Sequence, residues 1–321
     1  MVTTRFDAER RAQILLVGAL AIAFVIVGLA VLFNAVTYTG QTTVPEAGSS
    51  IDDASQFDFE ARRGARELVL RVNHDGVYGA KSPLASDVAA NVSDYSAVMG
   101  ATYSGHGAAV NVSFENATSD YGRRVVQDQE TVFTQDGTDS GSKDWQLVDE
   151  SDRVGWFAVT VNGTDLAEHS ANAFTINVSN DTGEYVEYRI YGKRSGVVNV
   201  TVDTSVGSGN GVYQFNTTRG HVVLDLIDGT SLMNRSARMP SIRRLEGTYN
   251  VTFQRGDEAS GLYSIVVPSA DRINGSITDC STAATPCHGP AIWNATVTTH
   301  YRSPSVNVTH NQTVPVYNST T

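Results

Sequence analysis

The segment Phe174-Thr-Ile-Asn-Val-Ser179 sets the fold class of this 321-residue chain. Its apolar side chains alternate with polar ones, and successive side chains of a strand point to opposite faces. The same period of two recurs at Phe157/Val159/Val161, Val186/Tyr188/Ile190, Val198/Val200/Val202, Tyr249/Val251/Phe253 and Val306/Val308. Turn-forming residues separate these runs. We therefore expect about eight antiparallel strands or more, with one face in water, in a sandwich-like domain.

Two helices are expected before the strands. From Phe57 to Val72 the apolar residues recur at spacings of three and four, and charged residues fill the opposite side. Ser55 and Asp58 resemble a capping box at the start of this helix. The stretch before it, 38–55, is rich in glycine, serine, threonine and acidic residues and is predicted to be a linker.

The second helix is expected over 83–103. Ser82 is its predicted cap, Pro83 suits the first helical position, and Gly105 is placed to end it. The predicted buried stripe consists of Leu84, Val88, Val92, Tyr95 and Met99. Such a stripe is more often part of a core than a ligand site.

An uncharged apolar run from Ile14 to Phe33 predicts a transmembrane helix. At about 1.5 Å per residue its 20 residues reach about 30 Å, which is the thickness of a hydrocarbon core. Arg5, Arg10 and Arg11 precede the run, so the N-terminus is expected in the cytoplasm and the C-terminal domain outside the cell. A cleaved secretory signal is the alternative, but the run is long for one.

Asparagine sequons give a second indication of this topology. Fifteen of the 18 asparagines after residue 37 are followed by any residue and then serine or threonine, and none of these sequons lies before the predicted span. The expected glycan acceptors are Asn91, Asn111, Asn116, Asn162, Asn177, Asn180, Asn199, Asn216, Asn234, Asn250, Asn274, Asn294, Asn307, Asn311 and Asn318. In a strand, the asparagine and hydroxyl residue of N-V-T share the outward face. The alternative is that these triplets are simply strand-forming sequence.

The composition is acidic, with 34 Asp and Glu against 23 Lys and Arg and a net charge of −11. This balance argues against a nucleic-acid partner, because phosphates require a basic surface. Only three of the basic residues are lysine, and aspartate outnumbers glutamate by 22 to 12. These preferences favour a surface adapted to high salt, where charge repulsion is screened. An ordinary acidic secreted protein is the alternative.

Cys280 and Cys287 are the only cysteines and are expected to form a disulfide outside the cell. A metal site that recruits His288 would be incomplete. The chain contains no paired-histidine zinc motif, no G-x-S-x-G turn and no phosphate-binding loop. The acidic loop over 136–144 lacks the EF-hand pattern. We expect no cofactor, no metal and no catalytic residues, with an extracellular enzyme as the minor alternative.

The junction Arg10-Arg11-Ala12-Gln13, followed by the apolar run, resembles the class III signal sequences of archaeal type IV pilins and archaellins. The resemblance implies cleavage after Ala12, with Arg11 at position −2 and Gln13 as the new N-terminus. The whole chain also looks like a family of haloarchaeal single-pass membrane proteins that begin R-A-Q. Pro45 and Val17 depart from the pilin pattern, because pilins usually continue their helix and carry a glutamate near position five.

The resulting prediction is a membrane-anchored, glycosylated, pilin-like or envelope structural protein. Its partners are the lipid bilayer and other pilin-like or envelope proteins that pack on the apolar helix. An anchored adhesion or ligand-binding module, with Trp145, Trp156 and Trp293 in a surface patch, is the alternative. The expected regions are a cytoplasmic N-terminus (1–13), a transmembrane helix (14–37), a linker (38–55), a helical region (56–105) and a β-rich extracellular domain (106–321).

Overall fold

The computed structural model describes residues 46–193, 196–232, 237–282 and 284–317. The predicted transmembrane helix, the processing junction at Arg11, Ala12 and Gln13, and the sequon residues Asn234 and Asn318 lie outside these residues. Neither of the two helices in the described part of the chain is long and apolar enough to cross a membrane.

Two α-helices precede the strands in the described residues. The helices are α2 (Glu46–Asp75) and α3 (Lys81–Ser104). The strands are β1 (Ala109–Phe114), β2 (Asp120–Val132), β3 (Trp145–Ser151), β4 (Trp156–Asn162), β5 (Phe174–Ser179), β6 (Tyr185–Lys193), β7 (Val197–Thr204), β8 (Gly211–Asn216), β9 (His221–Asp225), β10 (Thr230–Ser231), β11 (Tyr249–Gln254), β12 (Ser260–Val267), β13 (Thr278–Asp279), β14 (Cys287–Arg302) and β15 (Asn307–Pro315).

The strands form two sheets. The nine-stranded sheet has the order β1-β14-β2-β12-β4-β9-β10, with β13 and β15 also paired to β14, and the six-stranded sheet has the order β3-β11-β5-β6-β7-β8. Among the described strands, every pair is antiparallel except β13 with β14. The expectation of a mainly antiparallel β structure with two helices before it is confirmed.

Side chains from both sheets form one hydrophobic core. Phe253 of β11 lies with its ring centroid 6.5 Å from that of Phe157 in β4 and 5.2 Å from that of Tyr263 in β12. The alternating runs predicted from the sequence supply much of this core, because residues 174, 176 and 178 are fully buried, as are 157, 159 and 161. Burying one such large apolar side chain contributes about 1.5–3 kcal/mol.

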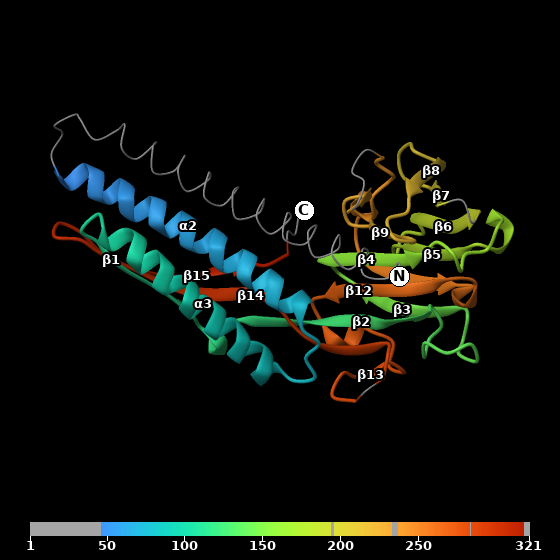
Figure 1. Ribbon diagram of the computed structural model, residues 1–321, viewed down its shortest axis with the longest axis horizontal. Helices are drawn as coiled ribbons and strands as arrows, with labels where there is room; N and C mark the ends of the chain where they lie inside the picture. The colour runs from blue at the N-terminus through green and yellow to red at the C-terminus, as the bar shows by residue number, and fades with distance from the viewer. Residues whose placement is uncertain (1–45, 194–195, 233–236, 283, 318–321) are drawn as a thin grey trace, which may run out of the picture. The chain divides into compact units, whose positions relative to one another are not determined.

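A second core joins the helices to the long strand β14. Phe57, Ala61 and Ala65 of α2 and Val88 and Val92 of α3 are buried in it. These helices run beside β14, β1 and β15 (Figure 1). The helices and the sheet therefore share a core, and the described residues from Ala54 to Tyr317 form a single compact unit.

Helix α2 begins earlier than the sequence predicts. The linker expected over 38–55 is helical from Glu46 onward, and Ser55 lies inside the helix instead of capping it. The segment is rich in glycine and serine, which have low helix propensity. Once a helix has formed, however, each added residue gains a hydrogen bond without a new nucleation cost, which favours extension through this segment.

Two smaller corrections concern α3 and β15. Helix α3 starts at Lys81 and has no side-chain cap, so Ser82 and Pro83 are its second and third residues. Val306 precedes β15 and packs, partly buried, against the core that contains the helices, whereas Val308, also expected to face a core, is 45% exposed. Strand β15 pairs only with β14 among the described strands, so this part of the sheet needs little apolar surface.

Candidate functional site

Four of the predicted glycan acceptors lie on the outer face of the six-stranded sheet. Asn177, Asn199 and Asn250 are partly exposed, whereas the residues that follow them in β5, β7 and β11 are fully buried valines. Asn216 is exposed at the end of β8. Burial of the apolar residues and exposure of the acceptors are thus compatible on this face, as the N-V-S/T pattern predicts.

A second group of acceptors lies on the face of β1, β14 and β15 opposite the one that packs on the helices, and Asn111 Oδ1 at this face also accepts from Ser96 Oγ of α3 at 3.1 Å. Asn111 is in register with His300, Asn307 with Arg302 and Asn311 with Thr298, so all three share one face. All three are exposed. Residues of β14 that alternate with these positions, including Val297 and Tyr301, are buried in the core that contains the helices.

Asn180 differs from the other described acceptors because it is buried. It is 5% exposed, and its Nδ2 donates to Glu184 Oε2 and to the main-chain oxygen of Glu246, both at 2.8 Å. Both amide hydrogens are therefore used, whereas an N-glycosidic bond replaces one of them. The folded structure argues against the predicted modification of Asn180.

Other sequon amides also donate hydrogen bonds. Their Nδ2 atoms bind the main-chain oxygens of Asp87 (from Asn91) and Gln146 (from Asn274), and the side chains of Asp120 (from Asn294) and Thr298 (from Asn311). The Asn116 side chain instead accepts a hydrogen bond from Tyr121. Each of these four amides uses one hydrogen and Asn116 uses none, so an N-glycosidic bond can replace the other hydrogen while the contact is kept.

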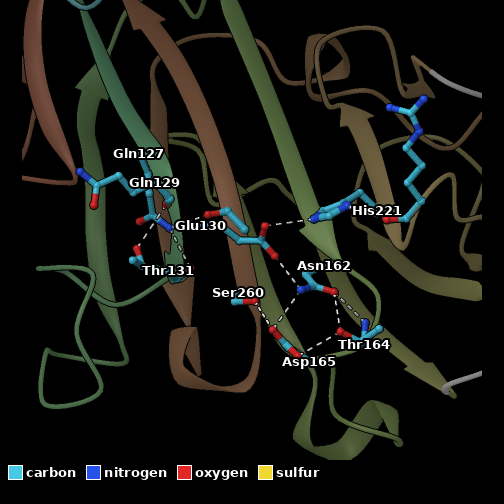
Figure 2. Close-up of polar contacts among 11 residues, drawn as sticks. Gln127, Gln129, Glu130, Thr131, Asn162, Thr164, Asp165, His221 and Ser260 are labelled. Carbon is cyan, nitrogen blue, oxygen red and sulfur yellow. Dashed lines mark hydrogen bonds and ion pairs between the residues drawn. The ribbon is translucent and has the colours of Figure 1, made fainter. Parts of the chain in front are cut away.

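Asn162 belongs to a polar cluster at one end of the nine-stranded sheet (Figure 2). Its Nδ2 donates to Glu130 Oε1 at 2.6 Å and to Asp165 Oδ2 at 3.1 Å, so both of its amide hydrogens are used, as at Asn180. Glu130 also lies 3.2 Å from His221 Nε2, and Ser260 Oγ donates to Asp165 Oδ2 at 2.6 Å. Residues from β2, β4, β9 and β12 meet here because the register brings the ends of these strands together.

Ser260 and His221 of this cluster do not contact each other through a shared carboxylate: Ser260 binds Asp165, and His221 binds Glu130. The hydroxyl of Ser260 is directed to a carboxylate, and the imidazole of His221 is bound to a different carboxylate. Nucleophilic catalysis by serine requires the hydroxyl to donate to its base, usually an imidazole. The arrangement instead orients Asn162, whose Oδ1 accepts from Thr164 Oγ1 at 2.7 Å.

The acidic loop over 136–144 lies near this cluster. An open hollow of about 610 Å³ is lined by Gly137, Thr138 and Asp139 together with Glu130 and Asp165. Asp136 Oδ1 accepts hydrogen bonds from both the main-chain nitrogen and the hydroxyl of Thr138, at 3.0 and 2.8 Å. Its carboxylate thus holds the turn. In the described residues, no three His, Cys, Asp or Glu side chains gather as metal ligands.

Cys280 and Cys287 form a disulfide with a Cα–Cα distance of 4.9 Å. The bond closes the loop that leads into β14, and Cys280 N donates to His288 O at 2.9 Å. Neither sulfur is available for the metal site considered with His288. Burial and the nearby Arg123 lower the pKa of the His288 imidazole, which favours its neutral form.

A buried polar network lies where α2 meets the sheets, and nothing in the local sequence pattern predicted it. Arg124 of β2 donates from Nη1 to the main-chain oxygens of Asn73 and Gly76, at 2.9 and 2.7 Å. These are carbonyls at the end of α2, where a cation is favourable. The ring of His74 lies against Trp156 at 4.6 Å between centroids, and burial lowers the pKa of this imidazole to about 3, with a smaller contribution from Arg124.

An open groove of about 880 Å³ crosses the outer face of the six-stranded sheet. Outward-facing residues of four adjacent strands form its floor: Gln146 of β3, Thr252 and Gln254 of β11, Thr175 of β5, and Glu187 and Arg189 of β6. The local sequence gave no signal for this groove, because its residues come together only through the strand order.

The tryptophans do not form the surface patch considered from the sequence. Trp145 and Trp293 are buried, and Trp156 is partly buried against His74. The chain matches no family model, no curated protein and no solved structure.

Proposed function

We propose that this chain is a cell-surface glycoprotein, anchored by a transmembrane helix over 14–37, with its N-terminus in the cytoplasm and a sandwich-like domain outside. The observation that carries the proposal is the position of the acceptors. Asn177, Asn199 and Asn250 face outward from one sheet, and Asn111 and Asn307 from the other. Glycans at these positions leave both hydrophobic cores intact.

Within this class we propose a pilin-like or envelope structural component. The R-A-Q junction before the apolar run supports processing between Ala12 and Gln13. The mature chain would then keep its apolar helix, which can pack with neighbouring helices through Gly18, Ala19 and Ala23. A rigid glycosylated domain outside the membrane suits such a role.

Mass spectrometry of the protein from its native host tests both parts. We expect an N-terminal peptide that begins at Gln13 and added sugar mass on peptides that contain Asn177 and Asn199. An N-terminus at Met1 or Val2 would contradict the pilin-like processing and leave the proposed anchor intact. Cleavage beyond Phe33 would contradict both. Bare Asn177 and Asn199 would show that the sequons are only strand-forming triplets.

A second candidate function is an anchored adhesion or ligand-binding module. The polar groove over β3, β11, β5 and β6 favours it, because its floor carries hydrogen-bonding groups from four strands. The expected result is binding of a saccharide array or of whole cells by residues 40–321, lost in Arg189→Ala. Assembly into filaments without any ligand would count against this function.

A further inference from the structure

The groove on the six-stranded sheet is polar and balanced in charge. Arg189 lies 2.6 Å from Glu187 and 3.8 Å from Asp203, so its charge is already compensated. At the rim, the main-chain nitrogen of Arg255 donates to Asp144 Oδ1 at 2.8 Å. Two guanidinium groups and two carboxylates line the groove, together with amides and hydroxyls. This lining offers both donors and acceptors, which suits a neutral, hydroxyl-rich ligand better than an ion.

The predicted acceptor Asn177 lies at the edge of this groove. It is in register with Thr252 of β11 on one side and with Glu187 of β6 on the other, and both residues line the groove. Opposed residues in a sheet have Cβ atoms about 4.5–5.5 Å apart. Thr175, two positions earlier in β5 and on the same face, forms part of the floor. A sugar on the amide of Asn177 therefore begins beside the groove.

We infer that the first sugars of an N-linked glycan at Asn177 lie in this groove and hydrogen-bond to Arg189 and Gln254. The inference rests on the proposed glycosylation and adds a bound conformation for one glycan. Gln254 is exposed, and Arg189 is partly exposed, so both can reach a ligand on the sheet surface. Two or three such hydrogen bonds are enough to hold a flexible glycan against the sheet.

Asn199 provides a matched comparison on the same sheet. It carries the same kind of triplet and also faces outward, but its register partners are Tyr191 and Gln214, neither of which lines the groove. A glycan at Asn199 thus extends from an open part of the face. The two sites differ in their surroundings, while the strand geometry and the acceptor motif are alike.

The test measures how fast limiting periodate cleaves the vicinal diols of each glycan. The full-length protein is purified from its native host, treated in the folded state, and followed by glycopeptide mass spectrometry at Asn177 and Asn199. The same reaction on the unfolded protein corrects for differences in glycan composition. We expect oxidation at Asn177 to be about tenfold slower than at Asn199 in the folded protein, and equal after unfolding.

Substitutions in the groove identify the residues that protect the Asn177 glycan from oxidation. Gln254→Ala, on the exposed floor of the groove, and Arg189→Ala should each raise the rate at Asn177 several-fold and leave Asn199 unchanged. Gln214→Ala, a matched truncation beside Asn199, should leave the rate at Asn177 unchanged. Because Gln254 is exposed, its truncation tests the contact without disturbing the core.

The outcomes separate this inference from the proposed function. Glycans at both sites with equal folded-state rates would overturn the bound conformation and leave the glycoprotein proposal intact. An Asn177 without a glycan, together with a glycosylated Asn199, would also overturn the bound conformation and leave the glycoprotein proposal intact. Bare asparagines at both sites would overturn both proposals.

Discussion

The side chain of Asn73 pairs with the main chain of Ile292 as a neighbouring strand would. Its Nδ2 donates to Ile292 O at 2.8 Å, and its Oδ1 accepts from Ile292 N at 2.9 Å. Asn73 is 1% exposed, and the two residues are 219 positions apart. A helix side chain thereby satisfies a buried main-chain donor and acceptor of β14, which ties the end of α2 to the sheet.

Replacement of this carboxamide should destabilise the protein strongly. Asn73→Ala leaves the N–H and C=O groups of Ile292 without their partner, and a buried unpaired polar group costs about 1–3 kcal/mol. We expect the free energy of unfolding to fall by about 2–4 kcal/mol, measured by chemical denaturation of the detergent-solubilised protein. Asn172→Ala, at an exposed position outside the sequons, is the control and should change it by less than about 0.5 kcal/mol. Equal effects of the two substitutions would contradict this role.

His74 should make stability depend on pH. Its pKa is lowered to about 3 in the folded protein from an ordinary value of 6.5. Below pH 6.5 the unfolded chain binds a proton at this imidazole that the folded chain does not bind. The free energy of unfolding therefore falls as the pH falls from about 6.5 towards 3, by up to about 1.4 kcal/mol per pH unit, and this effect is absent above pH 6.5.

The variant His74→Phe retains a ring against Trp156 and removes the titration. Denaturation midpoints between pH 7 and 4 should therefore fall less steeply in this variant than in the parent protein. His106→Phe, at an exposed position after α3, is the control and should keep the parental slope. An unchanged slope in His74→Phe would show that other groups cause the pH dependence.

The local pattern of the sequence was enough for much of the secondary structure. The alternation at 174–179 predicted a strand, and the spacing of Leu84, Val88 and Val92 predicted a helix face that is indeed buried. These patterns arise within one element, where the direction of each side chain follows from its position in the repeat. Tyr95, expected in the same stripe, is only partly buried, and its hydroxyl donates to Glu60 O at 3.0 Å.

The contacts that distinguish the candidate sites depend on strand order, which alternation does not determine. Arg124 reaches the end of α2 across about 50 positions of sequence, and Glu246 reaches Asn180 across 66. The groove combines β3, β11, β5 and β6, of which only β5 and β6 are consecutive in the chain. Sequence analysis therefore found outward-facing asparagines and missed which of them are enclosed.

The disulfide should contribute measurably to stability. Cys280 and Cys287 are 7 positions apart. In the chain-entropy model, the bond lowers the conformational entropy of the unfolded chain and so raises the free energy of unfolding by about 2–3 kcal/mol. We expect the double variant Cys280→Ser/Cys287→Ser to unfold at a lower temperature, and reductant to lower the melting temperature of the parent but not of the variant. Sensitivity of the variant to reductant would contradict this assignment, because these are the only cysteines in the chain.

Asn180 and Asn199 should respond in opposite ways to substitution. Asn180 uses both amide hydrogens inside the protein, so we expect no sugar on it, and Asn180→Ala should lower the free energy of unfolding by about 1–3 kcal/mol because Glu246 O loses its donor. Asn199→Gln should remove one glycan mass and change stability by less than about 0.5 kcal/mol. Intact mass and denaturation of the two variants distinguish these effects. A glycan on Asn180 would require the loss of one of these two hydrogen bonds, and it would mean that modification precedes the folding of the segment between β5 and β6.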